Sequence, residues 1–109
     1  MDTIRYFRLK NAGGFTAGIK VSYRDGKGDW VTRGPSGYAD IRCGEERTQD
    51  LRDLGIAEGA HVRLIALVHF GKDNYANEEY VFSSGEGKTA SYRLSGTTLI
   101  SKLELLDCR

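Results

Sequence analysis

The chain has 109 residues, of which 39% are hydrophobic and 28% are charged, a composition that suits one folded domain and argues against disorder. The 16 Lys and Arg residues nearly balance the 15 Asp and Glu residues, which excludes a polybasic nucleic-acid-binding tail and an acidic disordered tail. No run of 18 apolar residues is present, so the sequence predicts no membrane-spanning helix. Residues 1–10 lack the apolar core of a signal peptide, and we therefore expect a protein that is cytoplasmic or exported without a conventional signal peptide.

Alternation of apolar and polar residues predicts β-strands along most of the chain. Between Phe15 and Tyr23 every second residue is apolar, which is the period of a half-buried strand. Residues 61–70 alternate in the same way and are apolar on both faces at their middle, so we expect this strand inside a sheet. Further strands are predicted at residues 4–10, 30–33, 38–43, 78–83, 89–95 and 97–106.

Two segments allow more than one secondary structure. Residues 49–54 fit a helical turn, whereas residues 48–51 fit an edge strand. In residues 97–106 the leucines recur at helical spacing, but the preceding Ser95-Gly96 is typical of a two-residue hairpin and favours a strand.

Seven or eight short strands joined by glycine-rich turns predict an all-β fold, a single antiparallel β-sandwich over residues 1–109. In residues 51–62 a leucine, a short turn with glycine and an alternating strand follow one another. This segment resembles the crossover between the two sheets of immunoglobulin-like and fibronectin type III sandwiches. The resemblance implies a sandwich of that type, and a jelly-roll-like sandwich is the alternative.

Two polar loops form the candidate ligand site. Because successive antiparallel strands alternate in direction, we expect the loops at residues 25–29 and 71–77 to lie at one end of the sandwich. Loops held by a rigid scaffold commonly carry binding residues. The expected ligand-binding residues are Asp25, Lys27, Asp29, Trp30, Lys72, Asp73, Asn74, Tyr75 and Asn77.

The aromatic residues of this set suggest a sugar ligand. An aromatic ring can stack on a pyranose while nearby polar side chains bind its hydroxyls. Trp30, Tyr75 and also Tyr38 are the candidate rings. A core position is the favoured alternative for Trp30, since sandwiches often bury a tryptophan on the third strand, whereas Tyr75 is expected to be exposed.

The carboxylates of the same loops allow a calcium site as a second interpretation. Asp25 and Asp29 could supply oxygen ligands, and the shell could be completed from the second loop by Asp73, Asn74, Asn77 and Glu78. A tight hairpin with solvated charges explains the same residues without a metal. We therefore assign no cofactor and keep calcium as an alternative.

Histidines and cysteines form no recognisable catalytic or zinc-binding motif. His61 and His69 fall on one strand face, but about 27 Å apart at the rise of a strand, too far to share a site. Cys43 and Cys108 belong to no Cys-x-x-Cys pair, and we favour free thiols. No carboxylate pair, Ser-His-Asp order or phosphate-binding loop stands out, so we expect no enzymatic activity.

Charge is unevenly distributed along the chain, with basic residues predominating before residue 34 and acidic ones between residues 40 and 58. If the first two strands pair, their basic residues form one stripe that could meet an anionic surface. Its members are Arg5, Arg8, Lys10, Lys20 and Arg24.

These features favour a non-enzymatic, lectin-like binding module with a carbohydrate or another protein as its partner. The first alternative is a membrane-active or toxin-type small β protein, which approaches a membrane surface with its basic stripe and exposed tyrosines. The second is a protein-interaction or self-assembly module that forms homo-oligomers through sheet edges. Nucleic acid is not an expected partner.

Overall fold

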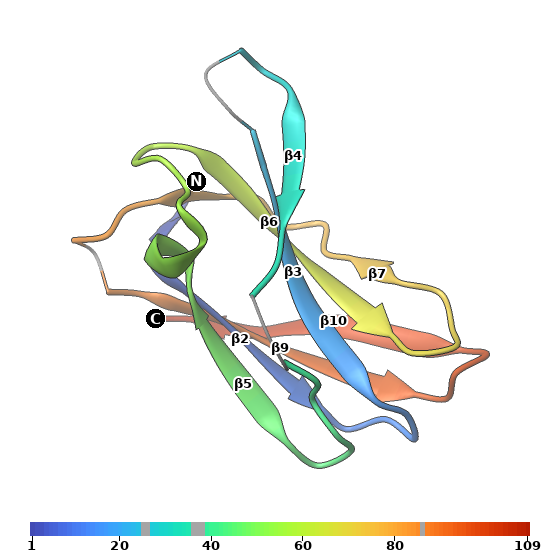
Figure 1. Ribbon diagram of the computed structural model, residues 1–109. Coiled ribbons are helices and arrows are strands. Elements are labelled where there is room, and N and C mark those ends of the chain that lie inside the picture. Colours follow the sequence, from blue (N-terminus) through green and yellow to red (C-terminus); the bar gives the residue numbers. More distant parts are fainter. Residues whose placement is uncertain (25–26, 36–38, 86) are drawn as a thin grey trace.

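The computed structural model describes residues 1–24, 27–35, 39–85 and 87–109, which form two β-sheets packed face to face (Figure 1). Sheet A has the order β1-β8-β6-β3-β4, with β7 also paired to β6, and sheet B has the order β10-β9-β2-β5. The predicted all-β sandwich is confirmed.

The elements follow one another as β1 (Thr3–Ile4), β2 (Tyr6–Asn11), β3 (Ala17–Arg24), β4 (Trp30–Arg33), β5 (Glu46–Asp50), the 3₁₀ helix η1 (Leu51–Leu54), β6 (His61–Val68), β7 (Asn74–Tyr75), β8 (Tyr80–Phe82), β9 (Thr89–Gly96) and β10 (Ser101–Cys108).

Both sheets are mixed, so the strand pairing within the sandwich is not antiparallel throughout. β1 pairs with β8 in parallel, and β2 pairs with β9 in parallel, with Phe7 opposite Ala90. Alternation of apolar residues reports that a strand has a buried face, but it does not report the direction of the neighbouring strand. The N-terminal strands are therefore inserted beside strands from the end of the chain.

The core lies between the two sheets and follows the alternation within each strand. In β2, Phe7 and Leu9 are fully buried while Arg8 points outward. The ring of Phe7 packs edge-on against Tyr80 at 5.7 Å between centroids and tilted against Tyr92 at 6.2 Å. Tyr80 belongs to β8 of sheet A, so its contact with Phe7 joins the two sheets.

Three segments differ from their predicted structure. Residues 39–43 form no extended strand but a single bridge between Ile41 and Ala17, and Tyr38 lies outside the described residues. Residues 46–54 contain both predicted alternatives, a strand followed by a helical turn. β5 ends at Asp50, and the side chain of Asp50 caps η1. The two-residue hairpin is replaced by a four-residue loop, because Gly96 pairs with Ser101.

The predicted basic stripe does not form, because β2 and β3 belong to different sheets. Arg8 and Lys10 project from sheet B, whereas Lys20 and Arg24 belong to sheet A. The first two strands therefore cannot present their charges on one face.

Cross-strand ion pairs cancel much of the charge asymmetry along the sequence. β2 runs antiparallel to β5, which places basic side chains beside acidic ones. Arg5 is 2.8 Å from Asp50, and Arg8 is 2.6 Å from Glu46. The N-terminal excess of positive charge thus meets the acidic segment within sheet B.

Within the described part of the chain, no helix has the length and hydropathy needed to cross a bilayer. Cys43 is exposed and Cys108 is half-buried, and the two thiols are not bonded to each other.

Candidate functional site

The two loops of the predicted site lie at opposite ends of sheet A. β3 and β6 are antiparallel, with Arg24 opposite His61 and Ala17 opposite Val68. The loop after Arg24 therefore leaves sheet A where β6 begins, whereas residues 71–77 follow the other end of β6 (Figure 1). The expectation that they share an end is wrong, because β4 and β6 both run antiparallel to β3 and flank it on opposite sides. One ligand cannot be held by both loops.

The first loop presents a tryptophan that is not in the core. Trp30 is 37% exposed and lies on β4, an edge strand that pairs with β3 alone among the described strands. The guanidinium carbons of Arg24 and Arg63 lie 4.8 and 5.0 Å from the centre of its ring. Lys27 and Asp29 are exposed nearby, and Asp25 lies outside the described residues. The favoured core position for Trp30 is therefore wrong.

The second loop brings most of its predicted residues to a hollow of about 390 Å³. The amide of Asn74 donates to Ser101 Oγ at 2.7 Å, which ties β7 to the start of β10. Asp73 accepts a long hydrogen bond of 3.4 Å from the backbone N–H of Val68. Asn77 is exposed but does not line the hollow. The lining residues are Lys72, Asp73, Asn74, Tyr75, Leu99, Ile100 and Ser101.

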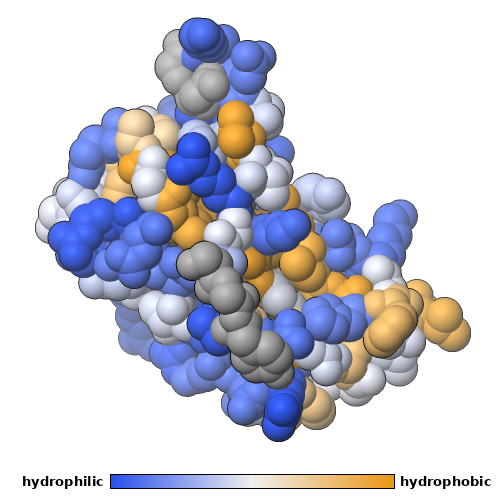
Figure 2. Space-filling model, viewed as in Figure 1, coloured by the Kyte–Doolittle hydropathy of each residue, from blue (hydrophilic) through white to orange (hydrophobic). Residues whose placement is uncertain are grey.

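Large apolar side chains project into solvent around this hollow. Phe70 is 101% exposed, Leu99 90%, Ile100 80% and Tyr75 70%. Figure 2 shows hydrophobic atoms protruding at this end of the molecule, on the right of the view. We call these four residues the apolar tip. Single exposed apolar residues are ordinary, but a contiguous group at one end of a domain is typical of an interaction surface.

Backbone geometry holds Phe70 away from the core. Phe70 has a φ of 63°, and among the described residues it is alone in combining a positive φ with a side chain. This left-handed conformation is unfavourable for a bulky residue. The next residue, Gly71, packs so closely on the carbonyl oxygen of Thr98 and on Val68 that a Cβ would overlap both. The β6–β7 loop and the β9–β10 loop therefore form one packed unit.

Two hydrogen bonds close the β9–β10 loop, and its apolar side chains lie outside. The N–H of Thr97 donates to the carbonyl of Ile100 at 2.8 Å, and the N–H of Ile100 donates to Thr97 Oγ1 at 3.2 Å. Leu99 and Ile100 occupy the turn and cannot reach the space between the sheets. In the sequence these two large apolar residues follow Ser95-Gly96 closely. The strand predicted over residues 97–106 included them, so their exposure in a turn was not predicted.

The calcium interpretation lacks a common position for its ligands. Asp29 belongs to one end of sheet A, whereas Asp73 and Asn77 belong to the other. Among the described residues, no group of three or more His, Cys, Asp or Glu side chains is placed to hold a metal ion.

Comparison with known proteins gives matches to solved structures alone. No family model and no curated protein matches the sequence. A structure described as a Gram-negative toxin superposes with a TM-score of 0.52 at 19% identity, covering 93% of this chain and 22% of that one. Listeriolysin O gives 0.51 at 13% identity, with 94% and 22% covered, and pneumolysin gives 0.50 at 14% identity, with 94% and 23% covered.

What the chain shares with them is the fold. The chain spans less than a quarter of each of these three proteins, so it is similar to one portion of each. Identities below 20% carry no assignment of individual residues.

Proposed function

We propose that this chain is a membrane-binding module of a toxin-type protein, and that it docks on a lipid bilayer through the apolar tip. The observation that carries the proposal is the exposure of Phe70, Leu99 and Ile100 on two loops packed against each other. Exposed apolar side chains of this size each gain about 1.5–3 kcal/mol when they leave water. A bilayer offers that gain without requiring a pocket in a partner protein.

The chemistry of the tip suits the boundary between headgroups and acyl chains. Phe70, Leu99 and Ile100 would enter the apolar layer, while Tyr75 has the ring and hydroxyl that favour the interface. Lys72 lines the hollow between the two loops, and its long side chain can reach the headgroups.

The loop that carries Leu99 is prepared for an environment without water. Unpaired backbone N–H and C=O groups are expensive in lipid. In this loop, hydrogen bonds between Thr97 and Ile100 close the turn. The tip can therefore move its side chains into a bilayer while exposing fewer unpaired backbone groups.

The position of the tip leaves the rest of the sandwich in water. Both chain termini lie at the opposite end of the molecule (Figure 1). The outer faces of the sheets carry charged side chains, among them Arg8 and Lys10 on sheet B and Lys20 on sheet A. Contact with lipid would therefore be restricted to one end.

The expected affinity of one copy is modest. Phe70, Leu99 and Ile100 together contribute at most about 5–9 kcal/mol, and association itself opposes binding by several kcal/mol. A single acyl anchor of similar hydrophobic size binds membranes reversibly. We therefore expect reversible docking by this chain alone.

Similarity to a structure described as a Gram-negative toxin supports the toxin-type part of the proposal. Docking of this kind needs no catalytic group.

Vesicle co-sedimentation tests the proposal directly. Vesicles of phosphatidylcholine, of phosphatidylcholine with phosphatidylserine, and of total lipid extract from animal cells are mixed with the protein and pelleted. We expect binding to at least one composition and its loss in the double variant Leu99→Ser/Ile100→Ser. Leu105→Ser is the matched control, because Leu105 is an exposed leucine of β10 that lies outside the apolar tip. Absence of binding to all three compositions, or equal loss in the control, would refute the proposal.

A further inference from the structure

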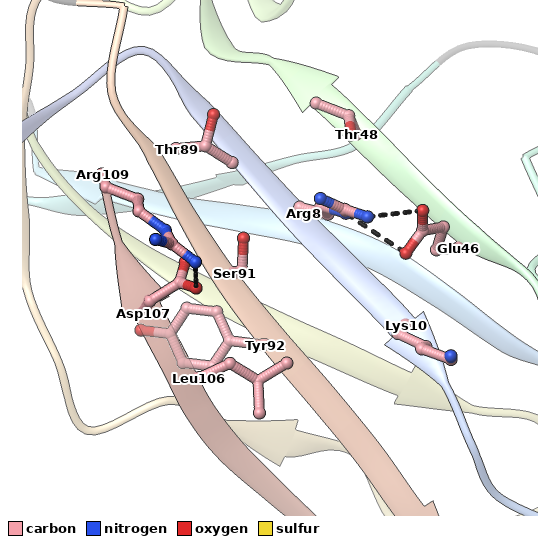
Figure 3. A pocket seen from close by; sticks show the side chains of 10 residues that line it. All are labelled: Arg8, Lys10, Glu46, Thr48, Thr89, Ser91, Tyr92, Leu106, Asp107 and Arg109. Atoms are coloured by element: carbon pink, nitrogen blue, oxygen red, sulfur yellow. Dashed lines mark hydrogen bonds and ion pairs between the residues drawn. The ribbon is translucent and has the colours of Figure 1, made fainter.

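A second hollow, of about 440 Å³, lies on the outer face of sheet B (Figure 3). It shares no lining residue with the hollow at the apolar tip. Thr89 and Ser91 of β9 form its floor, and Arg8 and Lys10 of β2 lie along one side. The other side is formed by Leu106, Asp107 and Arg109. We call it the sheet B trough.

Strand register explains why the trough exists. Ser91 lies directly between Arg8 on β2 and Asp107 on β10, so a short side chain is flanked by two longer ones. The pairing of β10 with β9 shifts between Leu105 and Asp107, which is the pattern of a β-bulge. The extra residue, Leu106, is 53% exposed and lines the trough. Bulges commonly redirect a side chain in this way beside binding sites.

The guanidinium groups of the trough are paired with carboxylates, whereas its two hydroxyls can still form hydrogen bonds with a ligand. Arg8 donates to both oxygens of Glu46, at 2.6 and 3.2 Å, and Arg109 is 3.2 Å from Asp107. The side-chain hydroxyls of Thr89 and Ser91 make no hydrogen bond to another described residue. A hydroxyl can donate one hydrogen bond and accept two. The trough therefore offers a ligand hydrogen-bond donors (the guanidinium groups), acceptors (the carboxylates) and hydroxyls that can donate and accept.

The trough holds three basic side chains and two carboxylates, and each guanidinium is paired with one carboxylate, which argues against a phosphate or sulfate as the main ligand. Glu46 and Asp107 stand beside the guanidinium groups and would repel an anion. Hydrogen bonds from Arg8 hold the pKa of Glu46 below its usual range, so this carboxylate remains an acceptor at neutral pH. A neutral ligand rich in hydroxyls fits this arrangement better.

We propose that the sheet B trough binds an oligosaccharide. Neighbouring hydroxyls of a sugar ring can each accept from a guanidinium and donate to a carboxylate, as Arg8 with Glu46 and Arg109 with Asp107 allow. Leu106 offers an apolar contact for the C–H face of a ring. The volume lies within the range of small-molecule sites, about 300–1,000 Å³.

The trough and the apolar tip can act together or separately. The tip is at one end of the sandwich, whereas the trough is on the outer face of sheet B. A bilayer at the tip and a glycan in the trough would therefore not compete for the same surface. The glycan proposal goes beyond membrane docking and does not rest on it.

An array of immobilised neutral and acidic oligosaccharides provides the first test, followed by calorimetric titration with the best-bound free oligosaccharide. Ser91→Phe fills the floor of the trough and should weaken binding at least tenfold. Ser95→Phe is the matched control, because Ser95 lies on the same strand and the same outward face but does not line the trough. Its affinity should equal that of the unmodified protein, and both variants should sediment with vesicles as the unmodified protein does.

Three results would overturn the assignment: no oligosaccharide bound by the unmodified protein, undiminished binding by Ser91→Phe, or equal loss in Ser95→Phe. Thermal unfolding midpoints verify that the variants are folded. If Ser91→Phe does not fold, Arg8→Gln replaces it, and retention of full affinity in that variant would equally refute the site. Loss of glycan binding with unchanged vesicle binding separates this proposal from the membrane proposal.

Discussion

Gly71 lies against the carbonyl oxygen of Thr98 with no room for a side chain between them. This contact joins the loop that carries Phe70 to the loop that carries Leu99 and Ile100. The apolar tip therefore depends on how the two loops pack against each other. A substitution at their contact can disturb it without changing any of its apolar residues.

We expect Gly71→Val to separate the two loops and to weaken vesicle binding. The added side chain would overlap the backbone of Thr98 and the side chain of Val68. Overpacking of this kind typically lowers the free energy of unfolding by about 1–3 kcal/mol. Urea unfolding and vesicle co-sedimentation measure the two effects. Gly85→Val is the control, because a Cβ at Gly85 meets no neighbouring atom within 4 Å, and it should leave vesicle binding unchanged.

Phe70→Asn should stabilise the fold while it weakens membrane docking. Asparagine tolerates the left-handed backbone at a φ of 63° better than phenylalanine does. We expect a gain in the free energy of unfolding of at most about 1–2 kcal/mol, the cost of the left-handed conformation. The fraction of protein bound to vesicles should fall because an exposed ring is lost. Phe70→Ala keeps the backbone strain and should show the docking defect without the gain in stability. Equal stability of the two variants would contradict this account of Phe70.

Asn11→Ala should be among the most destabilising single substitutions. The fully buried side chain of Asn11 donates to the carbonyls of Phe15 and Ile41, at 2.6 and 2.9 Å, and accepts from the N–H of Gly13 at 2.9 Å. Its removal leaves three backbone groups without partners, at a cost on the order of 3 kcal/mol. Chemical denaturation measures the loss, and Asn77→Ala, at an exposed loop position, should cost almost nothing.

Stability should fall in acid through the pair between Arg5 and Asp50. The hydrogen bond from Arg5 lowers the pKa of Asp50 below its usual range. A carboxyl whose pKa is lower in the folded state stabilises the fold fully above its unfolded pKa of about 4, and this stabilisation is lost as the pH falls through the folded value. Unfolding free energies measured between pH 6 and pH 2.5 should therefore decline less steeply in Asp50→Asn. An identical pH dependence would contradict the role of this pair.

Much of the sandwich can be predicted from sequence because burial of one face imposes a visible period. Residues 17–24 and 61–68 alternate as their burial does, and both segments are strands. The direction of the neighbouring strand produces no such pattern in the sequence. The parallel pairing of β2 with β9 joins distant segments, and their alternation would be the same if they were antiparallel.

The site was harder to predict because local geometry, more than composition, places its residues. Leu99 and Ile100 have the apolar character of a strand interior, but hydrogen bonds to Thr97 hold them in a turn. Phe70 gives no sequence signal of a positive φ. Trp30 has the size of a core residue, yet an edge strand and two neighbouring arginines keep it at the surface.

The parallel position of β2 also sets the order in which the domain can be assembled. β2 lies between β5 and β9, so one side of an early strand stays unpaired until β9 is available. During synthesis this leaves the backbone edge of β2, with Phe7 and Leu9, without a partner on that side while most of the chain is made. Contacts between such distant segments slow folding and extend the time during which an unfinished sheet can associate with other chains. Completion of sheet B by β9 therefore removes this unpaired edge.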